Sequence, residues 1–243
     1  ASALELYRSS KRLIPTLLDK PRTGKVTGLM VPPRQFLEDD MTARGVAKQP
    51  YHVLVDGNHG YNPRRDIHAV ACYHPLPPRS LIKIDKGFWV TSPELTFIQI
   101  CADEELSDFD IISLGYELCG TYVLDDSWDG LTCIDESLTS TEKIGRLINS
   151  IHRVPGIKRA RNLIKHVHDL SNSPMETTLA MLVSLPTTKG GFGLGPISLN
   201  HPVATPVGQR RVDIAFPKHR VGLEYQGKEF HSIEAAGRDA RRQ

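Results

Sequence analysis

The sequence predicts an α+β fold in two domains, and three observations support it. Short β-branched runs separated by Pro, Gly and Asn fill much of the first half, as expected of strands in a sheet. Capped segments with the apolar spacing of helices lie after them and again toward the C-terminus. The composition, 40% apolar and 24% charged over 243 residues, is that of a globular chain long enough for one large or two ordinary domains.

The N-terminal domain is predicted to be a mixed sheet closed by helices. A helix should begin at Pro93, because Thr91 or Ser92 can cap it and Glu94 favours the positive end of the helix dipole. A second helix is expected near residues 109–119. The runs predicted to be strands are 25–32, 51–57, 66–74, 81–85 and 87–91.

The domain boundary is predicted in an acidic, loop-like stretch between about residues 123 and 140, which gives domains 1–135 and 136–243. Charge also changes along the chain. Residues 1–150 carry 16 Lys and Arg against 21 Asp and Glu, a net −5, whereas residues 151–243 carry 14 against 7, a net +7. The basic part indicates a polyanion partner, most simply DNA, and the acidic part is a candidate surface for a protein partner.

Membrane and disulfide-rich classes are not expected. No run reaches about 18 uninterrupted apolar residues, and the first segment has no apolar secretory core. The four cysteines, Cys72, Cys101, Cys119 and Cys133, are widely spaced and fit no zinc or redox pattern. Free thiols in a reducing cytoplasm are therefore predicted.

The second domain is predicted to begin with two helices. One starts at Ser140 and stops at Pro155, and the next carries an apolar stripe with Lys158, Arg159 and Arg161 facing outward. These basic side chains are candidates for phosphate contacts. An ordinary solvated helix face is the alternative.

A third helix introduces the first candidate carboxylate. Ser173 can cap it, Pro174 suits its first position, and Glu176 lies in its first turn. The spacing Ser173-x-x-Glu176 is also that of a capping box, which is the structural alternative for Glu176. Between this helix and a short strand near residues 196–200, the glycine-rich stretch 189–196 is predicted to be a flexible turn rather than a phosphate loop, because phosphate loops follow a strand and precede a helix.

Carboxylates also interrupt a predicted β-hairpin, "RRVDIAF" (210–216) and "VGLEYQG" (221–227). Strand alternation and antiparallel pairing can bring Asp213, Glu224 and Gln226 together, and Glu176 could complete the group. Converging carboxylates repel one another unless a cation lies between them, and an all-oxygen site suits Mg²⁺ or Mn²⁺. The alternative is a pair of surface charges on a hairpin.

This order of residues resembles the PD-(D/E)XK phosphodiesterase superfamily. The segments 173–186 and 210–231 are most similar to its very-short-patch-repair-like branch of small bacterial proteins. The resemblance covers about the last 75 residues. It implies a restriction-endonuclease-like core, helix–strand–strand–strand–helix–strand, that holds Mg²⁺ for hydrolysis of nucleic-acid phosphodiesters.

The same resemblance implies roles for single residues. Asp213 and Glu224 would be the metal ligands, Glu176 the helix carboxylate, and Gln226 would occupy the place of the motif's Lys. His231 would be a further catalytic residue, and Asp239 and Arg242 match trailing positions of the family more weakly. Two departures stand out: Gln226 lacks the positive charge of Lys, and the final core strand is expected to be missing from a sequence that ends at Gln243.

The leading hypothesis is a metal-dependent endonuclease that hydrolyses DNA. Phosphate contacts are expected from Arg210 and Arg211, which precede Asp213, and from Lys228. The alternative is a DNA-binding regulator or antitoxin-like protein that keeps the nuclease fold without catalysis. A thinner resemblance of residues 87–101 to the middle domain of AbiEi-type antitoxin regulators accompanies it, although no winged helix of the kind that begins those proteins is evident.

Overall fold

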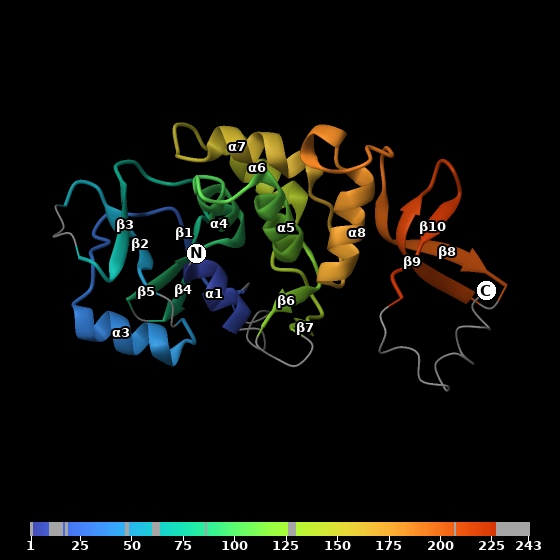
Figure 1. Ribbon diagram of the computed structural model, residues 1–243. Coiled ribbons are helices and arrows are strands. Elements are labelled where there is room, and N and C mark those ends of the chain that lie inside the picture. Colours follow the sequence, from blue (N-terminus) through green and yellow to red (C-terminus); the bar gives the residue numbers. More distant parts are fainter. Residues whose placement is uncertain are drawn as a thin grey trace. The chain divides into compact units, whose positions relative to one another are not determined.

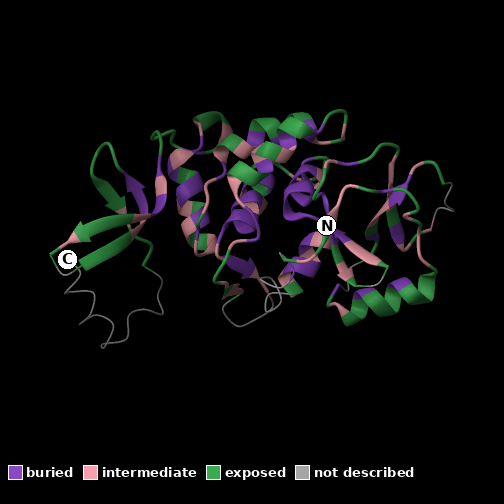
Figure 2. Cartoon of the chain, turned by 180° about the vertical axis from the view of Figure 1, so that it is seen from behind, coloured by how far each residue is buried: buried purple, intermediate pink, exposed green. Residues whose placement is uncertain are grey.

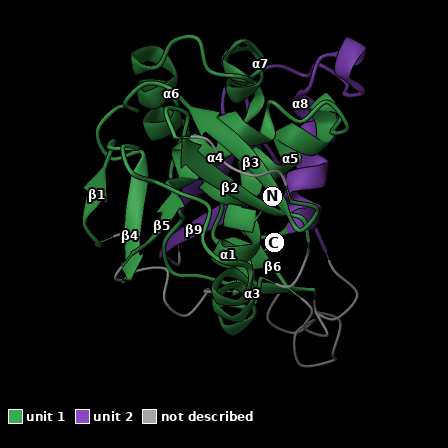
Figure 3. Cartoon of the chain, turned by 90° about the vertical axis from the view of Figure 1, so that its left-hand side faces the viewer, with its two compact units in different colours: residues 1–173 green, residues 174–243 purple. Residues whose placement is uncertain are grey.

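The structure, a computed structural model, has helices and small sheets in an α+β arrangement, as predicted (Figure 1). It describes residues 2–9, 17, 19–46, 49–59, 64–85, 87–125, 130–206 and 208–226. The chain divides into two compact units, residues 1–173 and 174–243 (Figure 3). No helix in the described ranges has the length and apolar character needed to cross a membrane.

The boundary between the units lies later than the sequence suggested. Helices α6 (Thr141–Ser150) and α7 (Ile157–Leu163) pack with α4 (Pro93–Ile100), and α7 also packs with α5 (Asp108–Cys119). Their apolar stripes are therefore part of the first core, and the predicted boundary at residues 135–136 falls inside the first unit.

The described part of the first unit contains three small sheets. β1 (Arg22–Thr23), β4 (Leu81–Asp85) and β5 (Phe88–Thr91) form an antiparallel sheet, β2 (Tyr51–Asp56) and β3 (Ile67–Cys72) a parallel pair, and β6 (Tyr122–Leu124) and β7 (Leu131–Cys133) an antiparallel pair. Four of the five predicted strands are confirmed, but 25–32 is not a strand. Gly28, at a φ of +80°, makes a turn there, and its N–H donates to Asp56 Oδ2 at 3.0 Å.

Local sequence signals explain where the helices of this unit begin. Ser92 caps α4 by accepting from the N–H of Leu95, and Pro93 is the first helical residue, as predicted. In α5, Ser107 and Asp110 form a reciprocal capping box. The described residues of this unit also form α1 (Ser2–Ser9), α3 (Arg34–Ala43) and the 3₁₀ turn η2 (Ile164–His166). All four cysteines are free, in agreement with the sequence.

In its described residues, the second unit is a helix followed by a three-stranded meander. It contains α8 (Pro174–Ser184), the 3₁₀ turn η3 (Thr187–Lys189), and strands β8 (Ser198–Thr205), β9 (Gly208–Phe216) and β10 (Val221–Leu223). The strands are antiparallel in the order β10–β9–β8, so β9 is central. β10 ends at Leu223, short of the predicted 221–227, and so Glu224 and Gln226 follow the strand rather than lie in it.

A buried ion pair anchors α1 in the first unit. Arg8 donates from Nε and Nη2 to the two carboxylate oxygens of Glu117, each at 2.7 Å. The Glu117 side chain is only 2% exposed, against 29% for Arg8. Loss of Arg8 would leave a buried carboxylate without its counter-charge, which is far more costly than loss of an exposed pair.

We predict that Arg8→Ala lowers the free energy of unfolding by about 3 kcal/mol. The matched control is Arg146→Ala, which breaks the exposed pair of Arg146 with Glu142 in α6 and should cost about 0.5 kcal/mol or less. Urea denaturation of both variants measures the difference. Equal losses of unfolding free energy in the two variants would show that the Arg8–Glu117 pair stabilises the fold no more than an exposed ion pair does.

Candidate functional site

Strand β9 separates an apolar face from a polar one. Ile214 is fully buried and stands opposite Leu199 in β8 and Leu223 in β10. Phe216, on the same face by alternation, is buried as well. Helix α8 packs against β9, and its Met181 is fully buried. Asp213 therefore lies on the opposite face of β9 from the large apolar side chains.

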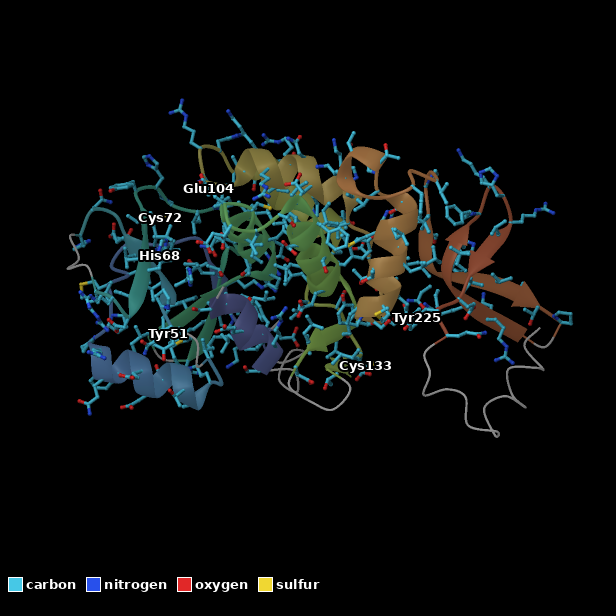
Figure 4. The ribbon with its side chains drawn as sticks, in the orientation of Figure 1. Tyr51, His68, Cys72, Glu104, Cys133 and Tyr225 are labelled. Atoms are coloured by element: carbon cyan, nitrogen blue, oxygen red, sulfur yellow. The ribbon has the colours of Figure 1, made fainter. Side chains whose placement is uncertain are left out.

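A hydrogen bond from Tyr225, the residue after Glu224, brings the chain beyond β10 to Asp213. The pairs Val221–Phe216 and Leu223–Ile214 set the register of β10 on β9, and Glu224 is the first residue after this ladder ends. The N–H of Tyr225, labelled in Figure 4, donates to Asp213 Oδ2 at 2.8 Å. The Asp213 carboxylate thus holds the chain beyond β10 against β9.

The candidate side chains are more exposed than the strand pattern implied. Asp213 is half-buried, while Glu224 and Gln226 are exposed. The reason is the early end of β10, which leaves residues 224–226 outside the ladder. A cation is therefore not needed to compensate for burial of these charges; the argument for one rests on the juxtaposition of two carboxylates.

The carboxylate oxygens of Asp213 and Glu224 are ligands of the type that a hard divalent cation prefers. In the part of the chain that the structure describes, no three His, Cys, Asp or Glu side chains are grouped so that they could hold a metal ion. Glu176, in the first turn of α8, does not complete a three-carboxylate group with Asp213 and Glu224. Mg²⁺ is commonly held by one or two carboxylates together with waters and substrate phosphates, which is what Asp213 and Glu224 can offer.

Asn200 is a site residue that the sequence did not indicate. The flanking pairs Leu199–Ile214 and His201–Val212 place it opposite Asp213 on the side away from Glu224. Asn200 is buried and has a φ of +47°, a left-handed conformation that Asn adopts more readily than most residues. Asn is also depleted in strands, and that was the one available signal. Asn200 and Asp213 thus lie at corresponding positions of β8 and β9.

The basic residues proposed for phosphate contacts divide between the two units. Lys158 and Arg161 are exposed on α7 in the first unit. Arg159 has a structural role instead: its guanidinium donates to Asp108 Oδ1 and to the carbonyl oxygens of Asp103 and Leu106, at 2.7–2.9 Å. Arg210 and Arg211 are exposed on β9 in the second unit. Four residues singled out from the sequence, Lys228, His231, Asp239 and Arg242, lie outside the described residues.

The glycine-rich loop after α8 caps that helix. The N–H groups of Phe192, Gly193 and Leu194 donate to the carbonyl oxygens of Leu182, Leu185 and Val183, at 2.8–2.9 Å. A side chain at Gly191 would collide with the carbonyl oxygen of Leu185, 2.2 Å from the position of a Cβ. These three N–H groups are thus engaged by the helix end and are not a phosphate cradle, in agreement with the expectation of a turn.

The N-terminal histidines do not form a metal site with one another. His52 and His68, from paired positions of β2 and β3, have ring centroids 5.1 Å apart (His68 is labelled in Figure 4). Burial lowers the pKa of His52. His59 instead contacts Asp56, with Nδ1 and Oδ2 3.0 Å apart. Among the described residues, His52 thus lies beside His68, and His59 contacts Asp56.

No model of a protein family matches the chain, and no match was found among the curated proteins or the solved structures. The site is therefore interpreted from its own chemistry and from the sequence resemblance.

The two roles of Asp213 can be separated by substitution. Asp213→Asn keeps an oxygen that accepts from the Tyr225 N–H but removes the charge, so the free energy of unfolding should change by about 0.5 kcal/mol or less. Asp213→Ala also removes the acceptor and should cost about 1 kcal/mol. Both variants should lose Mn²⁺ binding, measured by calorimetric titration beside urea denaturation. Wild-type Mn²⁺ affinity in Asp213→Asn would exclude this carboxylate as a ligand.

Proposed function

We propose that the second unit is a PD-(D/E)XK-like nuclease module that hydrolyses DNA phosphodiester bonds with Mg²⁺ or Mn²⁺. The observation that supports it most is the hydrogen bond from the Tyr225 N–H to Asp213 Oδ2, which holds the residue after Glu224 beside Asp213. The order helix–strand–strand–strand, from α8 to β10, agrees with the first four elements that the resemblance implies. Residues 174–243 carry 9 Lys and Arg against 6 Asp and Glu, a net +3, which favours a polyanionic substrate.

Each candidate residue has a role in this proposal. Asp213 and Glu224 would hold the cation, which when bound lowers the pKa of water and neutralises charge on the phosphate. Glu176 would orient the attacking water, and Gln226 would donate a hydrogen bond to a phosphate oxygen where the motif's Lys would supply a charge. His231 is proposed as a further catalytic residue. A cytoplasmic setting belongs to the same proposal.

The second candidate is a DNA-binding regulator that retains the fold without catalysis. Gln226 favours it, because an amide cannot neutralise a developing negative charge as an ammonium group does. The exposure of Glu224 and Gln226 also favours it, since electrostatic stabilisation is strongest where water is excluded. In this reading residues 1–150, with a net charge of −5, would bind a protein partner.

Plasmid nicking with Mg²⁺ tests the nuclease proposal. The full chain should nick supercoiled DNA, and Asp213→Asn should lower the rate by at least a hundredfold because it removes a cation ligand. Gln226→Lys, which restores the motif's charge, should raise the rate. Glu142→Ala, an exposed carboxylate of α6 in the first unit, is the matched control and should nick like the parent.

The outcomes distinguish the two candidates. Equal nicking by the parent and Asp213→Asn would exclude this site. Absence of nicking by both, together with tight and sequence-specific gel shifts in EDTA, would favour the regulator. If Gln226→Lys nicks plasmid while the parent does not, the second unit has a nuclease fold whose activity was lost with the motif's Lys.

A further inference from the structure

The two neighbouring arginines of β9 lie on opposite faces of a protruding ribbon. Over Gly208–Val212 the described partner of β9 is β8 alone, through the pairs Arg211–Pro202, Arg210–Val203 and Gln209–Ala204. β9 is exposed from Gly208 to Arg211, as Figure 2 shows in green at the outer part of the sheet. Because successive side chains of a strand alternate, Arg210 and Arg211 point to opposite faces of this ribbon.

Arg211 shares its face with the candidate site. It precedes Asp213 by two residues, so the two Cα atoms are about 7 Å apart along the strand and their side chains emerge on one side. Arg210 emerges with Val212 and Ile214, on the face of the large apolar residues, and stands opposite Val203. The sequence predicts a phosphate contact for both arginines. The ladder, however, directs their side chains to opposite faces of the sheet.

The polar face needs a cationic group if nucleic acid is to approach it. Asp213 places a carboxylate on this face, Glu224 follows the end of the neighbouring strand β10, and carboxylates repel a phosphate backbone. Within the three described strands of the unit, Arg210 and Arg211 are the only Lys or Arg residues. Neither has an ion pair or hydrogen bond from its guanidinium to another described group, in contrast to Arg159. The fork of N–H donors on Arg211 is thus available for bidentate contact with a phosphate.

We propose that Arg211 binds the backbone phosphate adjacent to the Asp213–Glu224 pair, and that Arg210 takes no part in this contact. The inference rests on the proposed DNA-binding function of the second unit and names the residue that positions DNA at its site. A two-stranded ribbon is narrow enough to follow the major groove of a duplex. The Arg211 face of β8–β9 would then meet DNA, with Arg210 directed to the other side.

Equilibrium binding to a short DNA duplex in EDTA tests the assignment without any cleavage. Fluorescence anisotropy over a series of salt concentrations gives the slope of log affinity against log salt for the parent, Arg211→Ala and Arg210→Ala. Each phosphate contact contributes about −0.9 to this slope. Arg211→Ala should flatten it by about 0.9, Arg210→Ala should leave it unchanged, and Arg211→Lys should restore most of it.

Arg210→Ala is the matched control, because it removes the same side chain from the neighbouring exposed position of the same strand. Equal flattening by both alanine variants, or flattening by Arg210→Ala alone, would overturn the inference. A parent that does not bind duplex DNA would overturn the inference together with the proposed function. A parent that binds with an Arg211-dependent slope but does not nick plasmid supports the inference and rejects hydrolysis. If the parent nicks plasmid but Arg211→Ala has the same salt slope as the parent, the result supports hydrolysis and rejects the inference about Arg211.

Discussion

The candidate site depends on the register of the ladder that joins β8, β9 and β10. Side chains alternate along a strand, so a slip of one residue would move every side chain of β9 to the other face. The buried Ile214 and Phe216 oppose such a slip, because it would bring them out of the core. The same constraint that buries these residues directs Asp213 and Arg211 to the opposite face. Packing thereby determines the position of the candidate site residues.

The site is built from exposed or half-buried carboxylates, and this affects how it could bind a cation. Two carboxylates that keep their hydration need little structural compensation, so the fold tolerates them without a ligand. The same hydration weakens their hold on Mg²⁺, which gives up its own waters reluctantly. Substrate phosphate oxygens would supply the remaining ligands. Cation and DNA binding at Asp213 and Glu224 should therefore reinforce each other.

Local sequence signals predicted much of the fold. Ser92 and Pro93 begin α4, Pro174 begins α8, and period-two alternation located β9 and the face of Asp213. These features depend on a few neighbouring residues and their intrinsic preferences. The hairpin turn followed from the Pro217–His219 segment in the same way, and the chain does turn there.

Features that depend on distant partners could not be predicted. The stretch 25–32 has strand-like composition, yet Asp56 holds a turn at Gly28. The helical spacing predicts that Arg159 faces outward, but its guanidinium contacts Asp108, 51 residues earlier in the chain. The position of Asn200 opposite Asp213 follows only from the β8–β9 register, which the spacing of residues alone does not define.

The central claim is that Asp213 and Glu224 hold a divalent cation on the polar face of the β8–β10 sheet. A crystal structure of the full chain grown with Mn²⁺ and a short DNA duplex, with anomalous scattering recorded for manganese, tests it most directly. The account predicts an anomalous peak within coordination distance of one oxygen from each of Asp213 and Glu224, and a DNA phosphate on the same ion. A manganese peak bound elsewhere, or none while DNA occupies the ribbon, would contradict it.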